Sequence, residues 1–597
     1  MTVFDELIFL ENHFVEERRN GRKMADLYES VQHAAHIIPR LYLMITVGSA
    51  YIKTKEAKAS YILKDILNMV KGVQQPVKGL FLRFYLLKTM KDLLPDKGSE
   101  YEDDENDVTD AIDFILKNFK EMNRLWIRLQ YMSSQKDDYK KEEEREELKT
   151  TVGENIYRLS SLNGLTVELY QNQILPNILD TLIICEDVMS HQFLIECMIN
   201  SFPDEFHLAT LQTLLDGISK LHKDVDIKTT IITLLDRLSE VAGTSEVNIF
   251  KMVQRHIEEI FIRFNSKMES NLVIQLSLLN FCIKCYPKET ENINSVLESS
   301  VNLIKKSREE KLNPECMRLL VKLLSIPLDT LSLKILDMPQ YPMLLKYMAY
   351  TGRRTVSLRI VKAVFKSKRK LDSIDILNQL LSFVEPLIKD DEDNEEETEA
   401  YEFAEEQESI AKLLHLIYND DLDTYYGLLQ RMKKELVQGG IKRMKYTIPS
   451  FVFNLFKFIY LLDDLVTKNK EKDNPRTEFS EEEEEEKGPV PELPSITIQK
   501  VFYQINELLG LITSDYPEIT LRLFCQAAQV IDNITNNIDL EDLAYDFIST
   551  SLLVYQDELA DSEEKLRAIK LIVGTISHLQ CFDPDNYDTL ASDAAQK

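Results

Sequence analysis

Apolar residues recur every three or four positions through most of the chain, which is the spacing of one face of an α-helix. The segment after residue 110 shows it clearly, with Ile112, Ile115, Phe119, Met122 and Trp126 on one stripe. The sustained alternation of apolar and polar residues that marks a half-buried strand is not found in the sequence. The pattern therefore predicts an all-α protein, with Trp126 in its core.

The segment 202–241 predicts a pair of antiparallel helices. Pro203 opens the first helix, whose apolar stripe runs from Leu208 to Leu221, and the second carries its stripe from Ile231 to Val241. Further helices are expected at 249–264, 269–285, 293–306 and 314–326, with breaks at Pro287, Pro314 and Pro327. A hairpin of about forty residues cannot bury its apolar face alone and must stack on its neighbours. We therefore predict an elongated, curved α-solenoid of HEAT/armadillo-like helical hairpins.

Composition supports such an array and locates the charge. Gly (16) and Pro (18) are scarce among 597 residues, whereas sheet-rich folds need both for turns. Three runs without Lys or Arg, at 100–107, 390–408 and 478–486, hold 25 acidic residues and leave only −4 of the net charge of −29 for the rest of the chain. A net negative charge of this size argues against nucleic-acid binding.

The acidic runs set the expected domain boundaries. We expect residues 1–389 to form an N-terminal helical solenoid with an acidic loop at 98–107. Residues 390–410 are expected to be an acidic disordered insertion, and residues 411–597 a C-terminal helical solenoid with an acidic, proline-containing loop at 471–495. The segment 137–149 mixes both signs of charge at helical spacing and is expected to be a solvated helix.

The search for chemistry yields only weak candidates. Phosphate-binding glycine motifs and nucleophile elbows are missing from the sequence. His256 with Glu258, the pair Cys282 and Cys285, and the acids at 583–588 each lack the further ligands of a metal site, so core packing or a surface turn is favoured for each. We predict no enzymatic activity, no cofactor and no metal.

Location is inferred from cysteines and from the N-terminal sequence. The seven cysteines are scattered singly through apolar stretches, the pattern of reduced thiols in an intracellular protein. The first residues carry acids where a signal peptide would be basic, and no stretch reaches eighteen uncharged apolar residues. Any membrane contact is therefore expected to be indirect.

One short segment, His36–Gly48, is unusually apolar. Pro39 suits the first turn of a helix, and a dense apolar run follows in which only Arg40 and Tyr42 carry polar tips. Such a helix is too apolar to be fully exposed. Arg40 therefore needs a partner, either a carboxylate or the carbonyls at a helix end, within the chain or across an interface.

This PRLYL segment at 39–43 resembles the hallmark of the large subunit of retromer, the vacuolar protein sorting-associated protein 35 family. The resemblance continues in order along nearly the whole chain. It includes GRKMADLYESVQ (21–32), GLFLRFYLL (79–87), EMNRLWIRLQ (121–130), FPDEFHL (202–208), IITLLDRL (231–238), KCYP (284–287), SIPLDT (325–330), RMKYTIPSFVF (443–453) and LRLFCQAA (521–528).

The resemblance implies a scaffold without enzymatic activity that holds two other retromer subunits. The arrestin-fold subunit would bind at Pro39, Arg40, Leu41, Tyr42, Leu43 and Arg83, and the phosphoesterase-fold subunit at Leu521, Arg522, Phe524 and Gln526. Sorting nexins, a late-endosomal Rab GTPase and cargo tails are further implied partners. The implied location is cytoplasmic, peripherally on endosomes, and the implied role is retrograde transport of cargo to the Golgi or the cell surface.

Relative to that family, the chain is expected to be shortened at both ends, which makes the phosphoesterase-fold dock the less complete of the two. Two other interpretations stay open at this point. A HEAT-type nuclear transport receptor is also acidic and helical, and an enzyme is a more distant alternative.

Overall fold

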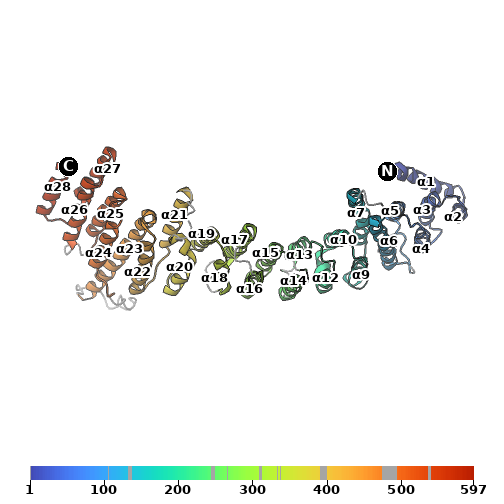
Figure 1. The fold of residues 1–597 in the computed structure, drawn as a ribbon, viewed down its shortest axis with the longest axis horizontal. Coiled ribbons are helices and arrows are strands. Elements are labelled where there is room, and N and C mark those ends of the chain that lie inside the picture. Colours follow the sequence, from blue (N-terminus) through green and yellow to red (C-terminus); the bar gives the residue numbers. More distant parts are fainter. Residues whose placement is uncertain are drawn as a thin grey trace, which may run out of the picture. The chain divides into compact units, whose positions relative to one another are not determined.

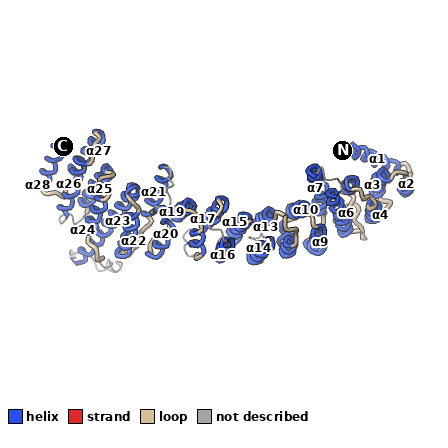
Figure 2. Tube along the Cα trace, in the orientation of Figure 1, coloured by secondary structure: helices blue, strands red, loops and turns tan. Residues whose placement is uncertain are grey.

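The computed structural model describes residues 2–597 except 105, 132–137, 242, 244–248, 265–266, 308–311, 332–333, 336–337, 390–399, 474–493 and 535–539. Helices dominate the described residues, and the extended pairing among them is limited to two isolated bridges, Asp103 with Asn106 and Leu371 with Ile417 (Figure 2). The prediction of an all-α solenoid is confirmed. The chain divides into two compact units, Met1–Ser307 and Arg308–Lys597.

The first unit is a succession of helices, most of them packed on the next helix, on the next but one, or on both (Figure 1). Its α-helices are α1 (Thr2–Arg19), α2 (Met24–Gln32), α3 (Ile37–Lys53), α4 (Ala59–Val70), α5 (Pro76–Met90), α6 (Val108–Arg128), α7 (Asp138–Ser160), α8 (Val167–Leu169), α9 (Leu175–Cys185), α10 (Val188–Ser201), α11 (Asp204–Ala209), α12 (Leu211–Ser219), α13 (Ile227–Val241), α14 (Phe250–Phe264), α15 (Met268–Cys285) and α16 (Thr290–Ser307). A 3₁₀ turn, η1 (Leu129–Tyr131), follows α6, and a π-helical turn, η2 (Tyr170–Ile174), precedes α9.

The second unit repeats this arrangement. Its helices are α17 (Pro314–Leu331), α18 (Gln340–Lys346), α19 (Tyr350–Ser367), α20 (Ile374–Ile388), α21 (Ala400–Leu414), α22 (Leu422–Gln438), α23 (Ile441–Asp473), α24 (Ile498–Gly510), α25 (Pro517–Asp532), α26 (Glu541–Asp557), α27 (Ser562–His578) and α28 (Pro584–Gln596). Helix α25 illustrates the stacking, because it packs on α24, α26 and α27. Its apolar stripe is thus buried between neighbouring helices, as a solenoid requires.

The predicted stripes are buried where the structure describes them. Ile112, Ile115, Phe119, Met122 and Trp126 lie in the core on α6. The indole Nε1 of Trp126 donates a hydrogen bond of 2.9 Å to the carbonyl of Arg145, so its polar atom is satisfied although the ring is fully buried. The interpretation of Trp126 as a core residue is confirmed.

Two expected helix boundaries were wrong. The helix from Pro203 is two helices, α11 and α12, because Thr210 leaves helical geometry (φ −113°, ψ 18°) while its hydroxyl donates to the Phe206 carbonyl. Pro327 does not end a helix but lies inside α17. Its ring is buried, so its packing against neighbouring side chains offsets the one backbone hydrogen bond that its missing N–H cannot make.

The acidic segments differ in part from expectation. Residues 400–410 of the predicted insertion belong to α21, where Glu406 is buried and pairs with Arg354, and residues 390–399 lie outside the described residues. Of the expected loop 471–495, residues 471–473 end α23 and residues 474–493 are outside the described part. The unit boundary falls between 307 and 308 rather than at 390–410, because α20 and α21 pack on one another and on α19 within a single unit.

The other two charged segments are described almost completely. In the loop 98–107, Asp103 accepts from the backbone of Asn106 and Asp107 caps α6 by accepting from Thr109 and Asp110. The segment 137–149 lies on α7 from residue 138 onward, but it is not solvated throughout, since the side chain of Arg145 is buried.

Candidate functional site

The PRLYL segment forms the beginning of α3. His36 is extended (φ −98°, ψ 125°) and α3 starts at Ile37, which places Pro39 in the first turn, where a missing backbone N–H costs no hydrogen bond. From Leu41 onward the helix is apolar on most sides and is packed against α1, α2, α4 and α5. The first turn of α3 is therefore held in place by these four helices.

Arg40 braces the turn that leads into α3. Its Nη1 lies 3.4 Å from the carbonyl oxygen of Gln32, the last residue of α2, and 3.4 Å from that of Ala34. Of the partners considered from sequence, the helix-end carbonyls are those found within the chain. Because both acceptors are orphan carbonyls after α2, a cation there also complements the helix dipole.

The other residues of the segment divide between core and surface. Leu41 is 5% exposed, whereas Tyr42 and Leu43 are half-buried and Pro39 is exposed. The Tyr42 ring lies 5.3 Å from that of Tyr85, and burial, with a smaller contribution from Tyr85, raises the pKa of Tyr42. The Tyr42 hydroxyl therefore stays neutral, and its ring packs against that of Tyr85.

Ile37, two residues before Pro39, was missed by the sequence reasoning. Its side chain is 59% exposed at the first residue of α3. Together, Ile37 and Pro39 form a small exposed apolar surface at the start of the helix, which we call the α3 entry surface. The signal was present in the sequence as a β-branched apolar residue at a helix start, where no neighbouring turn covers it.

Arg83 does not lie on this surface. It is on α5 and 2% exposed, its Nη1 is 3.3 Å from Oδ1 of Asn118 on α6, and its Nε has no hydrogen-bond partner. Burial lowers the pKa of Arg83, and the carboxylate of Glu121 opposes that shift. The structure assigns Arg83 to the α5–α6 core, since α5 is enclosed by α3, α4, α6 and α7.

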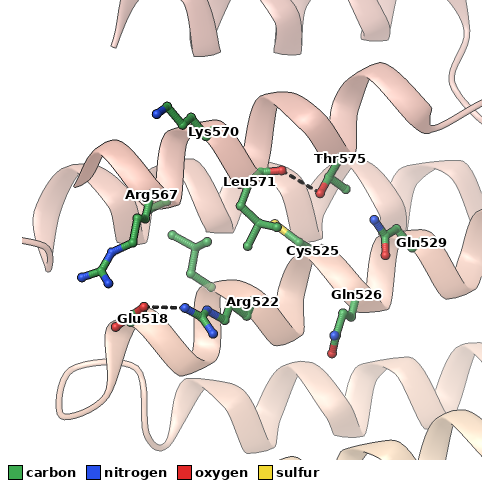
Figure 3. Close-up of a pocket in the computed structure, with 11 residues that line it drawn as sticks. Glu518, Arg522, Cys525, Gln526, Gln529, Arg567, Lys570, Leu571 and Thr575 are labelled. Carbon is green, nitrogen blue, oxygen red and sulfur yellow. Dashed lines mark hydrogen bonds and ion pairs between the residues drawn. The ribbon is translucent and has the colours of Figure 1, made fainter. Parts of the chain in front are cut away.

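The C-terminal candidates gather along a groove between α25 and α27, shown in Figure 3. The groove has a volume of about 480 Å³ and is lined by Leu521, Arg522 and Gln526 of the four predicted residues. Phe524 is on the opposite face of α25, where it is 1% exposed and its ring lies 6.0 Å from that of Phe547. Three of the four residues are thus brought together and the fourth is not.

The groove combines an apolar floor with a basic rim. The floor is formed by Leu521, Cys525, Ala568 and Leu571. Burial raises the pKa of the Cys525 thiol, with hydrogen bonds to Ser551 and Thr575 opposing it, so the sulfur is a neutral packing group. Such a floor suits an apolar side chain of a partner.

The rim carries three cations and one paired acid. Arg522 binds Glu518 on the same helix at 2.6 Å, whereas Arg567 and Lys570 reach the groove from α27. Figure 3 shows Arg567 on the opposite side of the groove from Glu518 and Arg522. The α27 residues were missed from sequence, because their position beside α25 follows only from the stacking of helices some 45 residues apart. The rim suits acidic groups on either side of an apolar anchor.

The weak chemical candidates lie in structural settings. His256 bonds the carbonyl of Met252 (2.9 Å) and Oδ1 of Asp216 (3.0 Å). Cys282 is buried on α15, and Asp583 precedes α28 in an exposed turn. Within the described ranges, no group of three or more His, Cys, Asp or Glu could hold a metal ion.

In the part of the chain that the structure describes, no helix combines the length and the apolar character needed to span a bilayer.

The chain matches one protein-family model, vacuolar protein sorting-associated protein 35, over residues 1–597. The chain belongs to this family. The family resemblance inferred from the PRLYL segment and the colinear motifs is therefore confirmed.

Curated members of the vacuolar protein sorting-associated protein 35 family align along the chain. Vacuolar protein sorting-associated protein 35A of Arabidopsis thaliana is 36% identical over 608 residues, covering 100% of this chain and 74% of the relative. The protein of the same family from Dictyostelium discoideum is 34% identical and covers 99% of this chain and 74% of its own length. That of Schizosaccharomyces pombe is 28% identical, with 98% and 72% covered. These relatives are named as sorting proteins and not as enzymes.

A structural match to a chain of a homology model of the full-length AP-3 complex covers 92% of this chain and 95% of that one. Its TM-score is 0.25 at 12% identity, which is too low to support any argument about this family member.

Proposed function

We propose that this chain is the scaffold subunit of retromer, binding the other retromer subunits and taking part in cargo recognition for endosome-to-Golgi and endosome-to-surface transport. The observation that carries this proposal is the match to the vacuolar protein sorting-associated protein 35 family along the whole chain. The arrangement of the two candidate sites supports it, because they lie in different compact units and can act separately.

The arrestin-fold subunit would bind at the α3 entry surface. Ile37 and Pro39 offer exposed apolar area, while Arg40 fixes the turn beneath them through the Gln32 and Ala34 carbonyls. In this role Arg40 positions the surface, and Leu41 anchors it in the core. A pre-formed surface loses little conformational entropy on binding.

The phosphoesterase-fold subunit would bind along the α25–α27 groove. Leu521, with Leu571 opposite, supplies the apolar floor, and Gln526, Arg522 and Arg567 supply polar contacts at the rim. An apolar centre with a polar rim is the usual anatomy of a protein–protein interface.

The remaining partners follow from the same proposal. Sorting nexins, a late-endosomal Rab GTPase and cargo tails would recruit the assembly to the cytoplasmic face of endosomes, with no bilayer contact required of this chain. The family match does not favour the nuclear transport receptor, and the names of the relatives do not favour an enzyme.

Pull-downs with the two purified subunits test both docks. Arg40→Trp removes two hydrogen bonds and adds bulk under the α3 entry surface, so it should abolish capture of the arrestin-fold subunit and leave the phosphoesterase-fold subunit bound. Arg19→Trp is the matched control, since Arg19 is an exposed arginine of the same unit at the end of α1. It should change neither capture.

Gln526→Trp provides the reciprocal experiment, because it fills the groove from an exposed position on α25. It should reduce capture of the phosphoesterase-fold subunit alone, whereas Gln379→Trp, at an exposed glutamine of α20, should reduce neither. Loss of both subunits from either variant would indicate unfolding instead of a blocked dock. Full capture of both by both variants would contradict the proposed sites.

A further inference from the structure

Basic residues follow one face of α19 and continue into the loop after it. Residues 350–371 contain eight Lys and Arg and no Asp or Glu, in a chain whose net charge is −29. Arg359 and Lys366 are two helical turns apart and therefore share a face. We use the name "basic stripe" for five exposed residues of α19 and this loop: Arg359, Lys366, Lys368, Arg369 and Lys370.

Little of this charge is neutralised by the protein itself. Helix α21 neutralises two other cations of α19, because Arg354 pairs with Glu406 and Lys362, which lies between Arg359 and Lys366, pairs with Glu405 at 2.6 Å. Lys366 is 4.0 Å from Asp329, and both side chains are 78% exposed, so their attraction is weak. Within the described residues, Arg359, Lys368 and Arg369 have no acidic partner.

The loop that carries the stripe is held in place. The N–H of Leu371 donates to the Leu416 carbonyl at 2.8 Å, and the N–H of Tyr418 donates back to the Leu371 carbonyl at 3.3 Å. The ammonium of Lys370 lies 3.9 Å from the centre of the Tyr418 ring, and that of Lys457 lies 4.8 Å from it. Two cations are thus fixed on one aromatic ring, which reduces the entropy they lose when they bind an anion.

Exposed apolar side chains flank the stripe. Phe365, one residue before Lys366, and Ile374, at the start of α20, are each 46% exposed. We propose that the basic stripe binds an acidic peptide segment of a partner protein, with an apolar side chain of that segment against Phe365 or Ile374. An anionic membrane attracts Lys and Arg in any arrangement, whereas cations held by backbone pairing and an aromatic ring favour carboxylates at defined positions.

The inference is independent of the two docks described above, and fluorescence anisotropy on the full chain tests it. The probe is a fluorescein-labelled peptide of alternating Glu and Asp with one central Phe, compared with the same peptide carrying Gln and Asn. We expect the acidic probe to bind at low salt and to weaken as salt screens the charges. Lys368→Glu combined with Arg369→Glu should weaken binding about tenfold or more, because two attractive charge contacts become repulsive.

The matched control is Lys305→Glu combined with Lys306→Glu, an exposed pair at the end of α16 with the same change in net charge. It should change the affinity less than about twofold, as befits sites that do not touch the probe. Both variants should keep the circular dichroism of the wild type and capture both retromer subunits. Equal loss in the control pair, equal binding of the Gln/Asn peptide, or no binding of the acidic peptide would overturn the proposal. The proposal would also be overturned if the chain bound only phosphatidylserine vesicles and the Lys368→Glu, Arg369→Glu variant lost that binding.

Discussion

Arg145 of α7 and Asp187 at the start of α10 form a buried ion pair, with 2.7 Å between Nη2 and Oδ2. The same carboxylate oxygen accepts the N–H of Ser190 at 2.8 Å and so caps α10. The guanidinium carbon of Arg145 lies 5.4 Å from the centre of the Trp126 ring, whose Nε1 donates to the Arg145 carbonyl. A single pair therefore joins α6, α7 and α10.

Removing one partner of this pair should destabilise the first unit strongly. Arg145→Ala leaves Asp187 buried without its counter-ion, a change that costs about 3–5 kcal/mol. Trp126 is the only tryptophan, so its fluorescence during urea unfolding reports on this segment directly. Lys117→Ala, which breaks the exposed pair with Asp113, should cost at most about 1 kcal/mol. A smaller effect of Arg145→Ala than of Lys117→Ala would refute the importance of the buried pair.

This cluster also shows where sequence reasoning works and where it ends. Burial of Trp126 was predictable because its neighbours repeat at helical spacing within one segment. Burial of Arg145 was not, because it depends on Asp187, 42 residues away, and the surrounding acids suggested a solvated face. A helical period identifies a face but does not identify what that face packs against.

The candidate sites follow the same rule. The partners of Arg40 lie six and eight residues before it, so helix-end carbonyls could be anticipated from sequence. Arg83 was placed with them by resemblance, yet its position on the buried α5 depends on the helices around it. In the C-terminal groove, Arg522 belongs to a recognisable motif, whereas Arg567 enters only through the stacking of α27 on α25.

His191 should make the stability of the first unit depend on pH. Its Nε2 lies 2.6 Å from the Leu182 carbonyl and its Nδ1 accepts the N–H of His222, so the ring is bonded as a neutral imidazole. Burial lowers the pKa of His191 below its usual 6.5. This contribution to stability is therefore fully present above about pH 6.5 and is lost as the pH falls through the folded-state pKa.

The comparison of wild type with His191→Gln isolates this effect. The variant should be less stable at pH 7.5, and its deficit should shrink as the pH is lowered to about 5, because glutamine takes up no proton. Urea midpoints from Trp126 fluorescence at each pH measure the deficit. A deficit that stays constant or grows on acidification would show that His191 does not resist protonation.

A substitution at Arg83 tests whether this residue belongs to the core or to the binding surface. Its buried Nε has no hydrogen-bond partner and its Nη1 bonds the neutral Asn118 amide, so Arg83→Met removes the desolvation cost of a buried cation and gives up a hydrogen bond worth about 0.5–1.5 kcal/mol. Arg83→Met should therefore keep the stability of the first unit and should still capture the arrestin-fold subunit. Loss of capture with unchanged stability would return Arg83 to the binding surface. Asn118→Leu is a useful companion, because it removes the acceptor for Arg83 and should be more harmful than Arg83→Met.

Two glycines of one helix region should respond to alanine in opposite ways. A Cβ at Gly439, where α22 ends, would stand 2.5 Å from the backbone oxygen of Ile388, which cannot move aside as a side chain can. Gly439→Ala should therefore cost about 1–3 kcal/mol. A Cβ at Gly427, within α22, meets nothing within 4 Å, so Gly427→Ala should stabilise by about 0.4–1 kcal/mol through helix propensity. Thermal unfolding measures the change in stability of each variant. A gain in stability from Gly439→Ala would contradict the close approach of α20 to the end of α22.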